Sequence, residues 1–329
     1  MGTLESAHTD QIHDVQLDYY GRRLATCSSD RRVKVFDASS GAQLAELSGH
    51  TAPVWQVSWA HPRFGTLIAS CSFDGTLAVW HEAQAGKWTH AFSSDSTLHR
   101  SSVNSVAFAP DELGLMLASA SSDGSLGLTS YSHSSRSWSF SRISDSAHLS
   151  GCLSVSWANA YPPEALLSTH ASSSGQASNN VKPVTMIASG GCDALVKLWQ
   201  LNENTGLWQL VQKLEKHTGW VRSVAWAPSL GLPIDTIASA GQDGRVIAWS
   251  KSELGGEFHP VIVAEYESPV WSVSWSTMGN MLAVADSSGA VKLYKEQADA
   301  HWVLLGDASV YEQQQRASGG KGEQAEPLA

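Results

Sequence analysis

Short segments in which apolar and polar residues alternate recur along the whole chain, and they predict β-strands with one buried face. The segments 54–59 and 221–226 are examples, each with valine and tryptophan residues separated by polar or small ones. A polar turn follows each segment, and then a continuous run of apolar and small residues such as 67–70. The dipeptide Asp74-Gly75 comes shortly after that run and predicts a tight hairpin turn, because glycine tolerates a positive φ.

Six copies of one arrangement of polar and aromatic residues divide these segments into repeats. In each copy a position typical of serine or threonine stands four residues before a position typical of aspartate and ten before a position typical of an aromatic residue. The complete His–Ser–Asp–Trp sets, which we call tetrads, are His50, Ser70, Asp74 and Trp80; His148, Ser189, Asp193 and Trp199; and His217, Ser239, Asp243 and Trp249. Repeats of about 40 to 50 residues built from short strands predict a β-propeller with one four-stranded blade per repeat.

We therefore expect an all-β propeller of six four-stranded blades over residues 8–306. The predicted blade boundaries are about 8–48, 49–93, 98–144, 147–215, 216–266 and 267–306, after an N-terminal lead of residues 1–7. The fourth repeat is longer than the others, and its polar segment at about 160–183 predicts a loop on the rim of the propeller. Residues 307–329 predict a flexible C-terminal tail, because they hold too little apolar content to pack.

The tetrads resemble catalytic groups, but their repetition favours a structural role. A catalytic triad occurs once in a site, whereas this set recurs in most repeats together with an aromatic residue. Inside a blade, the aspartate can accept from the imidazole ring and the ring can reach the serine hydroxyl, which satisfies buried polar groups. No phosphate-binding loop or metal motif is present, and the four cysteines lack metal-ligand spacing. We expect no enzymatic activity, no metal and no cofactor.

Composition and charge narrow the choice of partners. The net charge of −10 argues against direct binding to nucleic acid and against unaided binding to an anionic membrane. No run of about 18 apolar residues predicts a membrane span, and the N-terminus lacks the features of a secretory signal. We expect a location in the cytoplasm or the nucleus.

The two ends of the repeat array are the functional clue. Many propellers close when an N-terminal strand completes the last blade, but only seven residues precede His8, and the last repeat has its own outer strand near 301–305. If the ring keeps the curvature of seven blades, a gap remains that a partner could fill with its own strands. A closed six-bladed ring, acting as a general propeller adaptor such as a substrate receptor or a signalling subunit, is the alternative.

The candidate partner-binding residues lie on the strands beside this gap. They are Ile12, Val15, Leu24, Val33 and Val35 in the first blade and Trp271, Val273, Leu282, Val284 and Val291 in the sixth. Because alternate residues of a strand point to opposite faces, about half of them should face the neighbouring blade, and the sequence leaves open which half. The sixth tetrad is the most degenerate, with Glu267, Val284 and Ser288 in place of His, Ser and Asp.

Three stretches near the N-terminus, 13–30, 49–65 and 68–75, resemble the Sec-thirteen (SEC13) family of WD-repeat proteins. The resemblance runs from about His8 to Leu305, with a longer fourth repeat and Thr129 in place of a tryptophan as departures. It implies an open six-bladed propeller that accepts an insertion blade from a partner. That partner is a Sec-thirty-one-type subunit in the COPII vesicle coat on the cytosolic side of the endoplasmic reticulum. It is a Y-complex nucleoporin at the nuclear pores of the nuclear envelope. The family also takes part in a nutrient-sensing complex.

Overall fold

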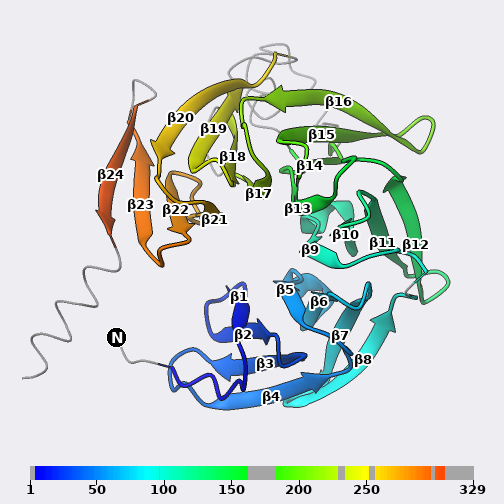
Figure 1. Cartoon of the computed structure of the whole chain (residues 1–329). Coiled ribbons are helices and arrows are strands. Elements are labelled where there is room, and N and C mark those ends of the chain that lie inside the picture. Colours follow the sequence, from blue (N-terminus) through cyan, green and yellow to red (C-terminus); the bar gives the residue numbers. More distant parts are fainter. Residues whose placement is uncertain are drawn as a thin grey trace, which may run out of the picture.

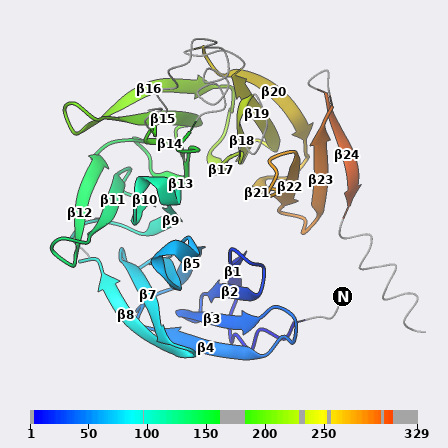
Figure 2. The same cartoon turned by 180° about the vertical axis from the view of Figure 1, so that it is seen from behind.

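The computed structural model describes residues 4–95, 97–161, 183–228, 234–251, 256–297 and 301–307. These residues form twenty-four β-strands in six four-stranded antiparallel sheets, which confirms the predicted propeller of six blades. The sheets are arranged around a common centre, as Figures 1 and 2 show from opposite sides. The predicted rim loop at 160–183 and the predicted tail at 307–329 lie almost entirely outside the described residues.

Each blade takes four consecutive strands, so every sheet is completed by its own repeat. Blades one to three consist of β1 (Ile12–Leu17), β2 (Arg23–Ser28), β3 (Arg32–Asp37) and β4 (Gln43–Ser48); β5 (Val54–Trp59), β6 (Leu67–Ser72), β7 (Leu77–Gln84) and β8 (Lys87–Ser93); and β9 (Val103–Phe108), β10 (Met116–Ser121), β11 (Leu126–Ser132) and β12 (Ser137–Ser144). Short 3-10 helices, η1 (Pro62–Phe64) and η2 (Asp111–Leu113), lie between the first two strands of blades two and three.

The second half of the chain repeats this plan. Blades four to six consist of β13 (Cys152–Trp157), β14 (Met186–Gly191), β15 (Leu195–Asn202) and β16 (Leu207–Glu215); β17 (Val221–Trp226), β18 (Asp235–Gly241), β19 (Arg245–Lys251) and β20 (His259–Glu265); and β21 (Val270–Trp275), β22 (Met281–Asp286), β23 (Val291–Glu296) and β24 (Trp302–Asp307). The first strand of each blade is nearest the centre and the fourth is outermost (Figure 1). No strand is shared between blade one and blade six in the described part of the chain.

The hydrophobic core lies between blades rather than inside any one of them. In one cluster, Ala25, Cys27 and Val35 of blade one pack with Val57 and Ile68 of blade two, and all five are fully buried. Equivalent clusters join blades two and three, three and four, four and five, and five and six. Each blade is therefore stabilised mainly by its neighbours, because the apolar area removed from water lies at their contact.

The tight turns between the second and third strands also connect neighbouring blades. Gly124 and Gly244 have φ values of 84° and 74°, a region that favours glycine. A Cβ atom at Gly124 would lie 2.1 Å from the carbonyl oxygen of His148, and one at Gly244 would lie 2.2 Å from that of Tyr266. Both glycines are thus required by the close approach of the segment that leads into the next blade.

Candidate functional site

The three complete tetrads form the hydrogen-bond networks that the sequence predicts. In blade five, His217 Nε2 lies 2.8 Å from Ser239 Oγ, and His217 Nδ1 lies 3.0 Å from Asp243 Oδ1. Trp249 donates its indole N–H to the same serine oxygen at 2.8 Å. Blades two and four repeat these contacts with His50, Ser70, Asp74 and Trp80 and with His148, Ser189, Asp193 and Trp199.

The electrostatics of these networks favour a structural role. Burial lowers the pKa of His148 and of His217, although Asp193 and Asp243 act in the opposite direction, so both rings are neutral at pH 7. A neutral ring that donates Nδ1–H to the aspartate accepts a hydrogen bond from the serine hydroxyl at Nε2, and the serine oxygen accepts a hydrogen bond from the tryptophan indole N–H. Every polar atom of the network then has a partner, and three blades share the same arrangement.

Blades one, three and six depart from the full tetrad in different ways. In blade one, His8 contacts Asp30 at 2.7 Å and Thr26 at 2.8 Å, with Phe36 at the aromatic position. In blade three, His99 contacts Ser119 at 2.8 Å, and Thr129 stands where tryptophan would be. Blade six has no such network among its described residues; instead, the hydroxyls of Tyr266 and Tyr294 lie 3.0 Å apart.

A second repeated feature, which we call the interblade ladder, joins the innermost strands. In each case a side-chain oxygen of one inner strand accepts the backbone N–H of a valine on the next inner strand, at 2.8 to 3.3 Å. The acceptors and the amides are Asp14 and Val57, Gln56 and Val106, Ser105 and Val155, Ser154 and Val224, and Ser223 and Val273.

The ladder has a second rung two residues further along each strand. The indole N–H groups of Trp59, Trp157 and Trp275 donate to backbone carbonyl oxygens of the preceding blade, at 2.8 to 3.1 Å. At the two other interfaces, Phe108 and Trp226 donate their backbone N–H to the hydroxyls of Ser58 and Ser156. Each of the five interfaces between successive blades therefore has the first rung and one of these two forms of the second rung.

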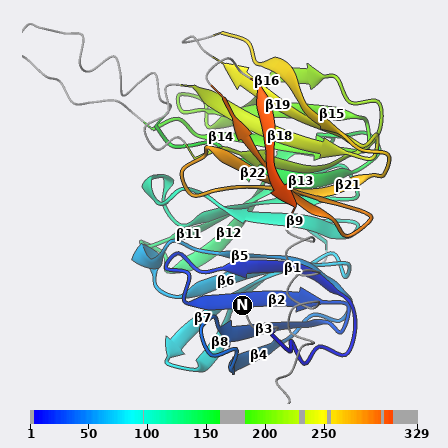
Figure 3. The same ribbon diagram turned by 90° about the vertical axis from the view of Figure 1, so that its left-hand side faces the viewer.

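Both rungs lack a counterpart between β21 and β1. The inner strands of successive blades lie side by side from β1 to β21, whereas β21 and β1 of the described chain make no comparable contact. Figure 3 views this side of the molecule, with blade six above blade one. Val15, which corresponds in register to the five ladder valines, is 50% exposed, whereas those five are at most 6% exposed. On β21, Ser272 and Ser274 are exposed where Ser154 and Ser156 serve as acceptors in blade four.

Apolar residues of blade six are exposed on the same side. Val291 and Leu293 of β23 are 37% and 38% exposed, whereas Leu77 and Val79 at the same positions of blade two are fully buried. Leu77 and Val79 pack against blade three, so Val291 and Leu293 lie on the face that a following blade would cover. Together with Val15 and Leu17 of blade one, these residues define two faces, which we call the terminal faces.

The structure separates the ten predicted partner-binding residues into two groups. Val15 is exposed, Leu24 and Ile12 are partly buried on blade one, and Val291 is exposed on blade six, as a terminal face requires. The other six residues lie elsewhere: Val33 and Val35 are buried against blade two, Val273, Leu282 and Val284 are buried against blade five, and Trp271 lies 4.0 Å below the guanidinium of Arg222 in blade five. The sequence left open which half of the ten residues faces the gap: these six side chains face an interface that is already occupied, the other four lie on the terminal side, and contact with a partner stays a prediction.

Sequence reasoning missed Leu17, Ser272, Ser274 and Leu293. The register carries the signal that would have found them: Val15 pairs with Thr26 as Val57 pairs with Ser70, so each residue of a terminal blade can be assigned the face of its buried counterpart. Leu17 lies two residues after Val15 and therefore shares its face of the strand, and Leu293 shares the face of Val291 in the same way.

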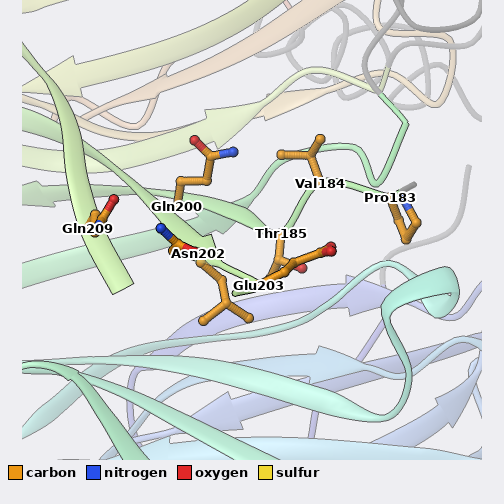
Figure 4. A pocket seen from close by; sticks show the side chains of 8 residues that line it. Pro183, Val184, Thr185, Gln200, Asn202, Glu203 and Gln209 are labelled. Carbon is orange, nitrogen blue, oxygen red and sulfur yellow. The ribbon is translucent and has the colours of Figure 1, made fainter. Parts of the chain in front are cut away.

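A cavity beside blade four is a weaker candidate for a site. A cavity of about 360 Å³ lies beside blade four and is lined by Pro183, Val184, Thr185, Gln200, Leu201, Asn202, Glu203 and Gln209 (Figure 4). Its walls are mostly amide and aliphatic side chains, without a cluster of titratable groups. Within the described ranges, no group of three His, Cys, Asp or Glu residues could hold a metal ion, and no helix is long and apolar enough to cross a membrane.

Comparison with known proteins agrees with the repeat structure. The WD domain, G-beta repeat family matches residues 1–37, 41–81, 90–128, 208–250 and 260–295. The chain is 46% identical to the Homo sapiens protein named "Protein SEC13 homolog", over 99% of this chain and 98% of that protein. It is 42% identical to the Drosophila melanogaster protein of the same name, over 92% and 82%. It is 40% identical to "Protein transport protein SEC13" of Mycosarcoma maydis, over 92% and 94%.

Proposed function

Because the chain belongs to the SEC13 family of WD-repeat proteins, we propose that it is a non-enzymatic scaffold subunit of a protein-transport coat. Two of its fungal relatives are named protein transport proteins, which supports a role in vesicle-mediated transport. Small propellers of this class typically bind other proteins, and the tetrads form repeated structural networks rather than one unique cluster of reactive groups.

The finer proposal is that a partner protein inserts a blade between the terminal faces. In the COPII coat on the cytosolic side of the endoplasmic reticulum, this partner is a Sec-thirty-one-type subunit. In the nuclear pore scaffold at the nuclear envelope, it is a Y-complex nucleoporin. The resemblance of the N-terminal stretches to the family suggests both partners. The propeller would then stiffen an elongated partner, without itself entering the membrane or binding nucleic acid.

One observation carries this proposal. The side chains that are buried at each of the five interfaces between successive blades are exposed at the two ends of the array. Val15 is 50% exposed while its five counterparts are at most 6% exposed, and Val291 and Leu293 are exposed on β23 of blade six. Apolar side chains and unpaired acceptors on facing strands are what an added blade would cover. An interface of this kind belongs to the obligate class, which buries on the order of 2,000 Å² or more.

Affinity capture of the full chain from its own cells, in high salt, tests the proposal. We expect a large partner at a one-to-one ratio, because an apolar interface with strand pairing survives salt that removes loose electrostatic contacts. Replacing Val15 by Asp should abolish this capture. The matched control is Val211→Asp on β16 of blade four, since Val211 is 52% exposed but lies away from both terminal faces.

The identity of the captured protein distinguishes a coat subunit from a nucleoporin. Recovery of a free monomer, or equal loss of the partner with Val15→Asp and Val211→Asp, would contradict blade insertion and favour a closed WD-repeat adaptor.

A further inference from the structure

We infer that the inserted strand continues the interblade ladder and is thereby held in one register. It runs parallel to β21 and β1, donates the backbone N–H of one apolar residue to Ser272 Oγ, and places an acceptor side chain on the preceding residue, which receives the N–H of Val15. This inference rests on the proposed insertion and adds the chemistry by which the partner strand is recognised.

The five existing interfaces show which chemistry the ladder accepts. Its first-rung acceptors are one carboxylate, one amide and three hydroxyls. The ladder therefore requires a side chain that can accept a hydrogen bond, but it does not require a particular residue type. At the end of the array, Ser272 is exposed, and its hydroxyl has no hydrogen bond within the described residues. It corresponds in register to Ser154 and Ser223, which both serve as acceptors.

At the blade-one end of the ladder, Asp14 takes the place of the acceptor that a preceding blade would supply. The N–H of Val15 is bonded at 2.9 Å by Asp14 Oδ1 of its own strand, where the equivalent amides of blades two to six use the preceding blade. The second oxygen of Asp14 accepts from Val57 at 3.2 Å, so this carboxylate serves both its own blade and the next. An acceptor on the inserted strand would take over the Val15 amide and leave Asp14 to its bond with Val57.

The two terminal faces also match faces that are already covered. Blade six presents Ser272, Ser274, Ala283, Val291 and Leu293 where blade four presents Ser154, Ser156, Ala188, Val196 and Leu198. Only Ala285 differs from its counterpart, Gly190, and alanine occupies that position in blades three and five as Ala120 and Ala240.

Blade one likewise resembles the face of blade six that blade five covers. Val15, Leu24 and Phe36 of blade one stand where blade six has Val273, Leu282 and Tyr294. Blade five already packs between blade four and blade six. The face of blade four resembles the terminal face of blade six, and the face of blade six that blade five covers resembles the terminal face of blade one. The occupant is therefore a strand with an acceptor residue followed by valine, isoleucine or leucine, as in Ser223-Val224 of β17.

A second copy of blade five is thus a defined probe for the site. We would fuse residues 216–266 to the C-terminus of the full chain through a flexible Gly/Ser linker and measure thermal unfolding and amide hydrogen exchange. We expect a higher Tm than that of the unfused chain and slower exchange at the Val15 amide. Ser272→Ala, or Ser223→Ala in the added copy alone, should each lower the docking equilibrium constant by about three- to tenfold, the effect of one hydrogen bond.

Two controls isolate the ladder from general effects on folding. Ser272→Ala should leave the Tm of the unfused chain unchanged, because its side chain is exposed and unbonded there. Ser287→Ala, an exposed serine of the β22–β23 turn, should leave docking of the added blade unchanged. A fusion that docks equally well with and without both ladder serines would overturn this inference alone. A fusion with no gain in Tm and no protection at Val15 would also count against blade insertion itself.

Discussion

Replacing Thr129 by valine should stabilise the protein, because the structure leaves the threonine hydroxyl buried without a partner. Thr129 is fully buried, and its Oγ1 atom has no hydrogen bond within the described structure. It occupies the position of the tetrad tryptophan, and Phe140, which pairs with it on β12, lies edge-on to the His99 ring at 5.5 Å. An unsatisfied buried hydroxyl costs about 1 to 3 kcal/mol. Valine has nearly the same shape, so we expect a gain of about 1 kcal/mol in the free energy of unfolding.

The matched control is the same substitution at Thr26. That residue is also buried, but its hydroxyl contacts His8 Nε2 at 2.8 Å. Thr26→Val should therefore lower the free energy of unfolding by about 1 to 2 kcal/mol, because it leaves a ring nitrogen unpaired. Urea denaturation of both variants, with unchanged slopes, gives the comparison. A loss of stability in Thr129→Val, or changes of the same sign in both variants, would refute the reasoning.

Three further predictions concern the tetrads and the terminal faces. Burial lowers the pKa of His99 from 6.5 to about 4, so the stability that its neutral form contributes is complete above pH 6.5 and is lost as the pH falls towards 4. Urea titrations at pH 7 and pH 4 should show a loss of up to about 3 kcal/mol from this residue that is absent in His99→Asn; equal pH dependence of the two proteins would contradict it. Trp249→Phe should cost at least about 1 kcal/mol in the same assay at pH 7, because it removes the donor to Ser239 and leaves a cavity in place of the five-membered ring, and an unchanged midpoint would argue against the bond. Val15→Asp should change the free energy of unfolding by less than about 0.5 kcal/mol, whereas Val57→Asp, which buries a charge, should prevent folding as followed by circular dichroism; comparable losses would show that Val15 is buried in solution.

Repetition made the fold predictable from the sequence. The tetrad spacing located the hairpin between the second and third strands of each blade, and the outer strand expected near 301–305 is β24. The same repetition identified the tetrads as structural, since His50, His148 and His217 occupy equivalent positions. These features depend on local periodicity, which a single sequence displays directly.

The face of each residue was harder to predict, because it depends on the contact between blades. Val33 and Val291 occupy the same position of their repeats, yet Val33 is buried against blade two and Val291 is exposed. Both are apolar residues of a third strand, and the difference arises from whether a following blade is present. Local sequence also hides the substitute role of Asp14, which bonds to amides on two different blades.

Since each blade completes its own sheet, the array behaves energetically as a chain of nearest neighbours with two free ends. Blades two to five are each held by two interfaces, whereas blades one and six of the described chain are each held by one. Opening of a terminal blade therefore breaks half as many contacts as opening of an inner blade, and the ends should fray first. A molecule that joined the two ends would do more than add its own contacts. It would remove the ends, and loss of any single blade would then require two interfaces to break at once.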